Sequence, residues 1–263
     1  MIRPGVVLVG HGSMRVESAG APLLALAESL RAECASVAVR FLRQEPRLDP
    51  ADPMLTADHW VVPVLIGGGG LMAELAGRVG PARLTAPVGT HPGFATLVAA
   101  QAVAAAAGAG IDPAAAVLLL IAHGARQANG AAQPAQELAE RLSVSRRFGR
   151  VMALFLEQEP RAAAWADHVG DGPVVVVPLL LSAGGHVRTD LPALFVGGEV
   201  VLASPPTDLA AIVRDLLGLP PKPARGEAPD PPLFLGVFFG FGAHGDTGTG
   251  LPVCERRTRG RTT

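Results

Sequence analysis

An internal repeat is the feature that most constrains how this 263-residue chain folds. The segment FLRQEPR at residues 41–47 recurs as FLEQEPR at residues 155–161, with Arg43 replaced by Glu157. Two shorter anchors recur in the same order and at nearly the same spacing: His11-Gly12 as His123-Gly124, and Val62-Pro63 as Val177-Pro178. Self-similarity of this kind predicts two copies of one structural unit.

Each copy is expected to contain strands that alternate with helices. Apolar stretches rich in Val, Ile and Leu predict buried strands at residues 6–9, 37–42, 60–66, 117–121, 174–181 and 200–203. Amphipathic or Ala-rich stretches predict helices at about residues 21–34, 92–107 and 207–217. The alternation predicts an α/β fold with two parallel sheets, each covered by helices on both faces.

The repeat also sets the predicted division of the chain. We assign residues 1–112 to a first half and residues 113–218 to a second half. Residues 219–263 begin with a proline-rich linker and continue into a tail that we expect to be disordered or to dock on a partner.

Composition excludes several classes of partner and compartment. The net charge is −1 and the basic residues are dispersed, which disfavours nucleic acid and anionic membranes as partners. The apolar runs are shorter than the roughly 20 residues that cross a bilayer. The first apolar stretch, residues 6–9, is too short for a secretory signal, and two cysteines make no disulfide framework. We therefore expect a cytoplasmic protein.

The candidate site lies in the second copy. His123, Glu157 and His186 each follow a predicted strand, so in a parallel sheet they converge on one edge. Gly184 and Gly185 precede His186 and allow the backbone to come close to a ligand. Two imidazoles and a carboxylate suit a divalent metal such as Fe²⁺, Co²⁺ or Ni²⁺, and they equally suit proton acceptors.

The first copy is not equivalent to the second. It keeps His11, but it has Arg43 in place of the carboxylate and Leu71 in place of the second histidine. A guanidinium repels a metal cation, so we expect no metal site there. We interpret this copy as a lid or a substrate-binding half, with His11 and Ser13 as candidate contacts; a purely structural His11 is an open alternative.

Two other enzyme classes find little support in the sequence. The chain has no G-x-S-x-G nucleophile elbow, and Ala125 stands where the first copy has Ser13, which disfavours a serine hydrolase. It also lacks a Walker sequence and a G-x-G-x-x-G that opens a helix, so nucleotide binding is not indicated.

The residues of both copies resemble the sirohydrochlorin chelatases of the CbiX and SirB type. The resemblance covers roughly residues 5–217 and rests on three motifs: Gly10-His11-Gly12-Ser13, Phe155-Leu156-Glu157 followed by Pro160, and Val177-Pro178-Leu179-Leu180-Leu181 with Gly185-His186 and Asp190-Leu191-Pro192. It implies two flavodoxin-like halves around a cleft. It also implies a lyase that inserts Co²⁺ or Fe²⁺ into a tetrapyrrole without ATP, for cobalamin or sirohaem synthesis.

The resemblance implies roles for individual residues. His123 and His186 would handle the metal and Glu157 would assist them, with no cofactor beyond the substrate metal. The interval to Pro160 is one residue shorter than is usual in the family, so Glu159 is an alternative carboxylate. In long members of the family the complete site often lies in the first half, whereas here the second half carries it.

Three arginines are candidate contacts for the substrate. The repeat alignment places Arg126, Arg188 and Arg43 near the same edge, where they are candidate contacts for tetrapyrrole carboxylates. The alternative to an enzyme is a non-catalytic protein of the same fold that carries metal or tetrapyrrole to a partner. Neither the metal, the tetrapyrrole nor the oligomeric state follows from the sequence.

Overall fold

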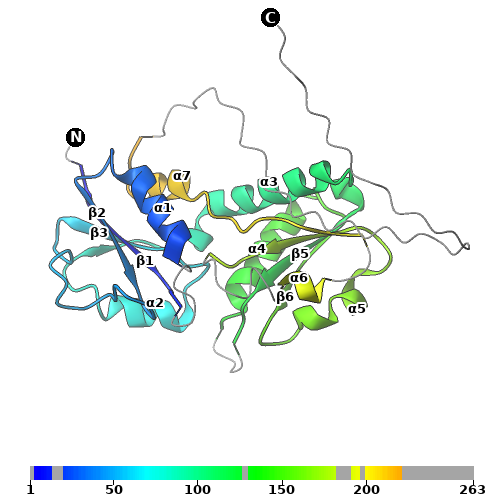
Figure 1. The fold of residues 1–263 in the computed structure, drawn as a ribbon, viewed down its shortest axis with the longest axis horizontal. Coiled ribbons are helices and arrows are strands. Elements are labelled where there is room, and N and C mark those ends of the chain that lie inside the picture. Colours follow the sequence, from blue (N-terminus) through cyan, green and yellow to red (C-terminus); the bar gives the residue numbers. More distant parts are fainter. Residues whose placement is uncertain (1–2, 14–19, 126–129, 182–190, 196–198, 221–263) are drawn as a thin grey trace, which may run out of the picture.

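Two four-stranded parallel sheets form the framework of the molecule (Figure 1). The computed structural model describes residues 3–13, 20–125, 130–181, 191–195 and 199–220. The first sheet has the order β2-β1-β3-β4, with strands β1 (Gly5–Gly10), β2 (Ser36–Phe41), β3 (His59–Pro63) and β4 (Arg83–Leu84). The second has the order β6-β5-β7-β8, with strands β5 (Val117–Ala122), β6 (Arg150–Phe155), β7 (Val174–Pro178) and β8 (Val200–Leu202). The predicted α/β fold with two parallel sheets is confirmed.

The two central strands, β1 and β5, are buried on both faces. All six residues of each strand are buried, which explains why each appears in the sequence as a continuous apolar run. In β1, Val6 and Leu8 face one hydrophobic core, and Val7 and Val9 face another, as the two-residue period of a strand requires. Each sheet must therefore be covered on both sides.

Helices supply this cover. The helices are α1 (Ala21–Leu30), α2 (Gly69–Ala76), α3 (Pro92–Gly108), α4 (Gln133–Val144), α5 (Ala166–Val169), α6 (Leu191–Leu194) and α7 (Ala210–Leu216). Buried residues of α1, α3, α4 and α7 join the inner faces of both sheets in one shared core. Helix α2 covers the outer face of the first sheet, and residues of α6 and Trp165 cover that of the second. None of the described helices is long and apolar enough to cross a membrane.

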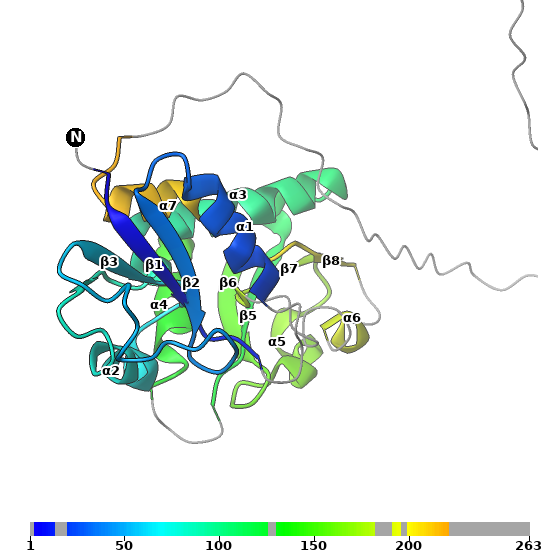
Figure 2. The same cartoon turned by 60° about the vertical axis from the view of Figure 1, so that its left-hand side comes forward.

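Helices α3 and α7 are exchanged between the two sheets. Helix α3 follows the first sheet in the chain but packs on β7 and β8 of the second, and α7 follows the second sheet but packs on α1 (Figures 1 and 2). Each sheet thus receives a helix from the other half of the repeat. This exchange explains why the inner core is continuous across the molecule.

Polar contacts hold the exchanged helices in place. On α7, Arg214 donates two hydrogen bonds, of 2.7 and 2.8 Å, to the carboxylate of Glu33. Its side chain is only 8% exposed, and the Glu33 carboxylate raises the pKa of Arg214. The next residue of α7, Asp215, lies 2.8 Å from Nε2 of His91, whose Nδ1 accepts from the Gly93 amide at the start of α3. His91 thus joins the two exchanged helices.

The two halves approach most closely at Gly67, which follows β3. A Cβ atom on Gly67 would lie 2.0 Å from Cγ of Pro134 and 2.4 Å from its Cβ, at the start of α4. The first of the four glycines at residues 67–70 thus lets the two halves approach closely. Helix α2, which begins within the same glycines, was not predicted.

We expect Gly67→Ala to destabilise the protein by about 1–3 kcal/mol, because the added methyl group must displace either this loop or helix α4. Gly70→Ala, two residues into the start of α2, is a matched control, since no other part of the described residues lies within 4 Å of its added Cβ. Alanine also favours the helix at that position. Thermal unfolding of both variants tests the contact, and equal melting temperatures would show that the halves do not meet here.

Candidate active site at the carboxyl edges of the sheets

His123 and His11 occupy equivalent turns at the ends of β5 and β1. Nδ1 of His123 lies 3.2 Å from the carbonyl oxygen of Gly124, and Nδ1 of His11 lies 2.8 Å from that of Gly12. A carbonyl oxygen only accepts, so Nδ1 carries the proton in both rings. The neutral form of each imidazole therefore has its lone pair on Nε2, and both side chains are exposed. A basic nitrogen of this kind can accept a proton or bind a metal.

Each turn depends on its glycine and on a glutamine from the neighbouring strand's end. Gly12 and Gly124 have φ values of 74° and 71°, in the left-handed region that favours glycine. A Cβ on Gly124 would lie 2.8 Å from Cγ of Gln158. The Gln158 side chain in turn accepts a 3.0 Å hydrogen bond from the amide of Ala125, as Gln44 does from Ser13 in the first half. The turns are held in the same way in both halves.

Glu157 follows β6 directly beside His123. Its amide donates a 3.0 Å hydrogen bond to the His123 carbonyl oxygen, and the amide of Arg43 makes the equivalent 2.9 Å bond to His11 in the first half. The backbone of Glu157 in one half is therefore held as the backbone of Arg43 is in the other. This contact confirms the residue equivalence that the repeat alignment predicted.

The alternative carboxylate, Glu159, has a structural task that both halves share. Its carboxylate accepts a 3.1 Å hydrogen bond from the amide of Arg161 and lies 3.4 Å from that residue's Nε. Glu45 makes the same two contacts with Arg47 in the first half, at 3.0 and 3.6 Å. Glu159 thus belongs to a turn common to both copies, which leaves Glu157 as the carboxylate peculiar to the second.

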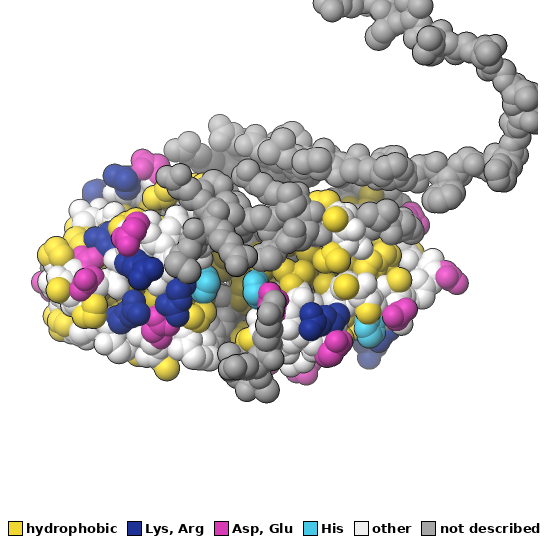
Figure 3. All heavy atoms as spheres, turned by 60° about the horizontal axis from the view of Figure 1, so that its bottom comes forward, with side chains coloured by type: hydrophobic (Ala, Val, Ile, Leu, Met, Phe, Trp, Pro, Cys, Tyr) yellow, Lys and Arg dark blue, Asp and Glu magenta, His cyan; other side chains and the backbone are white. Residues whose placement is uncertain are grey.

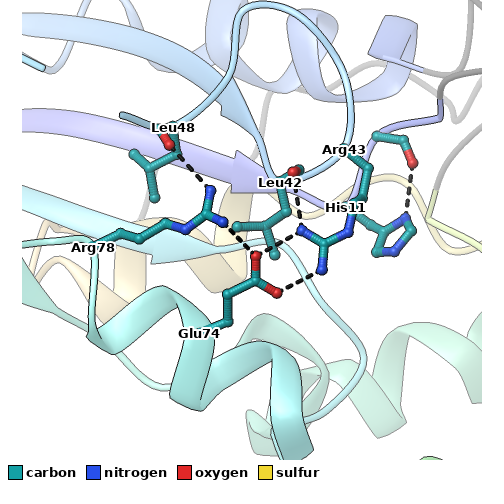
Figure 4. Close-up of polar contacts among 7 residues, drawn as sticks. His11, Leu42, Arg43, Leu48, Glu74 and Arg78 are labelled. Carbon is teal, nitrogen blue, oxygen red and sulfur yellow. Dashed lines mark hydrogen bonds and ion pairs between the residues drawn. The ribbon is translucent and has the colours of Figure 1, made fainter. Parts of the chain in front are cut away.

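An ionic network occupies the same edge of the first sheet (Figure 4). Nη1 and Nη2 of Arg43 each donate a 2.6 Å hydrogen bond to the carboxylate of Glu74 on α2. Arg78, one turn further along, donates to the same carboxylate at 2.7 Å. The Arg43 hydrogen bond is the main reason that the pKa of Glu74 lies below its ordinary value, with Arg78 and His11 adding to the effect.

This network predicts a pH-dependent contribution to stability. Because the folded state lowers the Glu74 pKa, its stabilising effect is complete above the ordinary value of 4.5 and is lost as the pH falls through the lowered value. We expect Glu74→Gln to cost about 1–2 kcal/mol at pH 7 and progressively less below pH 4.5. Urea unfolding at several pH values measures this.

The control for this prediction is Glu28→Gln, which removes an exposed carboxylate paired with Arg31. Solvent screens that pair, so its loss should change stability little at any pH. A Glu74→Gln deficit that persists unchanged at low pH would contradict the ionic origin of the effect.

Five of the predicted site residues lie outside the residues that the structure describes. His186, Gly184, Gly185, Arg188 and Arg126 belong to this group. The described chain ends at Leu181, just after β7, and resumes at the buried Leu191. Within the described ranges, no group of three His, Cys, Asp or Glu side chains is placed to hold a metal ion. The metal-handling roles of His123, Glu157 and His186 stay predictions.

The carboxyl edges of the two sheets adjoin one another. The contact between Gly67, which follows β3, and Pro134, which begins the helix after β5, joins the two edges directly. Figure 3 shows histidine side chains on both sides of the hollow between the halves, with arginine and acidic side chains gathered on the face of the first half. A ligand in this hollow would meet both halves.

The roles of three residues that support the site were not predicted from the sequence. Gln158 and Gly124 hold the His123 turn, and Glu74 binds Arg43. The identity of Gln44 and Gln158, and of Gly12 and Gly124, across the repeat was an available signal. Glu74 has no counterpart in the repeat that could have indicated its role. It also lies on helix α2, which was not predicted because it begins with glycines.

Comparisons of sequence agree with the fold and the repeat. Residues 117–221 match the family model of CbiX, so the match falls on the second half. A protein of Halobacterium salinarum, named a probable sirohydrochlorin cobaltochelatase, is 26% identical over 221 residues, which cover 71% of this chain and 75% of the relative.

Solved structures share the architecture. A multi-domain protein from Deinococcus radiodurans, DR2241, described as structurally similar to chelatases, is 27% identical with a TM-score of 0.64; the match covers 81% of this chain and 54% of that one. This chain thus spans about half the length of the Deinococcus protein. CbiX, described as the terminal enzyme of sirohaem biosynthesis in denitrifying bacteria, is 22% identical with a TM-score of 0.64, over 81% of this chain and 98% of its own.

A third structure, SirB from Bacillus subtilis with Fe³⁺, has a TM-score of 0.62 at 20% identity, over 82% of this chain and 92% of its own. These last two likenesses show the shared fold of two parallel sheets. Taken with the CbiX model matched by the second half, the comparisons show that this chain is similar to the CbiX and SirB class II chelatases.

Proposed function

We propose that this chain inserts Co²⁺ or Fe²⁺ into sirohydrochlorin or a related tetrapyrrole without ATP, as a lyase of cobalamin or sirohaem biosynthesis. The observation that carries the proposal is the exposed His123, whose Nδ1 is bonded to Gly124 and whose Nε2 therefore holds the lone pair, beside Glu157. The match of the second half to the CbiX model, and the named cobaltochelatase relative, support the reaction class. We also propose a cytoplasmic location.

Metal insertion requires two kinds of assistance. The hydrated cation must lose water, and two pyrrole N–H groups of the macrocycle must lose their protons. A neutral imidazole serves both needs, as a metal ligand and as a proton acceptor near pH 7. Either role requires a lone pair on Nε2 of His123. The hydrogen bond from Nδ1 to the Gly124 carbonyl oxygen fixes this tautomer, so no carboxylate is needed for that purpose.

Glu157 and the residues after β7 complete the proposed site. Glu157 would attract the cation or accept a proton, since the backbone already fixes the tautomer of His123. His186 would be the second imidazole, with Gly184 and Gly185 letting the backbone approach the substrate. Arg126 and Arg188 would contact substrate carboxylates, and His11 and Ser13 would contact the macrocycle from the first half.

Which metal is inserted would depend on the supply of each metal in the cell as much as on the ligands in the site. Imidazole and carboxylate ligands accept Fe²⁺, Co²⁺ and Ni²⁺ alike. The Halobacterium relative is named a cobaltochelatase, and the SirB structure contains Fe³⁺. Cobalt and iron are therefore the first metals to test, with nickel as the third.

A spectral assay tests the function directly. The purified chain is mixed with sirohydrochlorin and Co²⁺, Fe²⁺ or Ni²⁺, and the visible spectrum is followed against a protein-free reaction. We expect catalysed conversion over many turnovers with at least one of the metals. Binding of one equivalent of metal or tetrapyrrole without faster conversion would instead indicate a carrier protein.

A further inference from the structure

Arg43 uses only part of its guanidinium for contacts within the first half (Figure 4). Nη1 donates to Glu74 and, at 3.1 Å, to the Leu42 carbonyl oxygen, and Nη2 donates to the second oxygen of Glu74. The Nε–H and the outer Nη2–H have no partner among the residues that the structure describes. The side chain is 38% exposed. One edge of the guanidinium, with two parallel donors, is thus available to a ligand.

The surrounding charges make this edge suited to an anion. The two guanidinium groups of Arg43 and Arg78 outnumber the single carboxylate between them, so the network keeps one positive charge. A planar edge with two parallel N–H groups fits a carboxylate in a bidentate manner. Because Glu74 already holds the guanidinium in place, little side-chain entropy would be lost on binding.

The position of Arg43 connects this edge to the proposed reaction. Its amide is bonded to the carbonyl oxygen of His11, in the arrangement that places Glu157 beside His123 in the other half. The contact between Gly67 and Pro134 brings the carboxyl edges of the two sheets together. A molecule in the hollow would therefore lie between the segment that carries His123 and Glu157 and the segment that carries His11 and Arg43.

We infer that Arg43 binds a carboxylate of the tetrapyrrole side chains and so fixes which way the macrocycle lies across the hollow, with its nitrogen atoms toward His123. This role rests on the proposed function, since it takes the tetrapyrrole as the substrate. Equivalent positions of the two halves would then have opposite roles. Glu157 would interact with the metal cation, and Arg43 would bind the carboxylates at the edge of the macrocycle.

Binding of metal-free tetrapyrroles tests this role. Uroporphyrin, whose side chains all end in carboxylates, is titrated into the full chain, and its fluorescence reports the affinity. We expect Arg43→Met to weaken binding by about 10- to 100-fold, the effect of losing a charged hydrogen-bonded pair. Arg43→Lys keeps a charge but loses the planar edge, so it should lie between the variant and the wild type.

Arg78→Met is the structural control, because it removes the other arginine of the network while Glu74 keeps both bonds to Arg43. Figure 4 shows Arg78 on the side of Glu74 that faces away from His11. Because this variant also removes the excess positive charge of the network, we expect its affinity for uroporphyrin to fall, but by much less than that of Arg43→Met, which loses the paired donors as well. A porphyrin with N-methylpyridinium groups in place of carboxylates should bind no more weakly to Arg43→Met than to the wild type.

Several results would overturn the role of Arg43. They are wild-type affinity in folded Arg43→Met or Arg43→Lys protein, an equal loss in Arg78→Met, or an equal loss of affinity for the cationic porphyrin. Thermal unfolding of each variant establishes that it is folded, and Arg43→Lys keeps the test valid if the methionine variant is not. The titration contains no metal, so a chain that binds uroporphyrin through Arg43 but inserts no metal would contradict only the proposed function.

Discussion

Replacing His123 with alanine is expected to lower the rate of metal insertion by about 10²–10⁴-fold, the range that a positioned proton acceptor contributes. The Nε2 atom of this ring carries the lone pair that would receive the metal or a pyrrole proton. The loss should appear in kcat, because the missing group acts on the reacting atoms and not on the rim of the substrate. Initial rates from the visible spectrum, at several concentrations of tetrapyrrole, separate kcat from KM.

His11→Ala is the matched control for this variant. His11 occupies the same turn, with the same hydrogen bond to the following glycine, in the half that has Arg43 in place of the carboxylate. We expect this variant to raise KM while kcat stays within a few-fold of the wild type. Equal losses of kcat in the two variants would show that the halves share the chemistry, against the assignment to the second half alone.

The second large effect is expected from Gly124→Ala. The φ of Gly124 is 71°, and the added Cβ would lie 2.8 Å from Cγ of Gln158, so the turn must move. The carbonyl that binds Nδ1 of His123 belongs to this residue, and the imidazole would therefore shift with it. A displacement of about 1 Å at a reacting group can cost about 10²-fold in rate. We expect a loss of that size in kcat, measured with the same assay.

Gly110→Ala separates this effect from general backbone strain. Its φ of 73° is nearly the same, and it lies in the loop after α3, where, apart from its chain neighbours, none of the described residues comes within 4 Å of the added Cβ. This control should lose about 1–2 kcal/mol of stability and keep the wild-type rate. If Gly124→Ala keeps the wild-type rate as well, the turn does not position a catalytic group.

Much of the fold could be predicted from the sequence because the repeat and the buried strands are local signals. The apolar runs at β1 and β5 predict strands whose two faces are both covered, and the structure has them. Helix α2 was not predicted because it begins at Gly69-Gly70, and glycine disfavours helices. The exchange of α3 and α7 leaves no trace in periodicity, since a helix shows the same apolar face whichever sheet it packs on.

The site could be predicted in its outline but not in its contacts. The equivalence of Arg43 and Glu157 followed from the heptapeptide alone, and the hydrogen bonds to His11 and His123 confirm it. The contacts of Glu159 with Arg161, which place Glu159 in a turn common to both halves, required the structure, and the role of Glu157 stays a prediction. The partner of Arg43 also depended on tertiary structure, since Glu74 lies on the unpredicted helix.

The central claim is that the metal belongs to the second half of the chain. Equilibrium dialysis of the full chain against Co²⁺, with the visible absorption of bound cobalt as a second signal, tests it most directly in the wild type, His11→Ala and His123→Ala. We predict a single Co²⁺ per chain in the wild type and in His11→Ala, with imidazole-type absorption, and loss of that ion in His123→Ala. Two ions per wild-type chain, or loss of cobalt in His11→Ala with retention in His123→Ala, would contradict the claim.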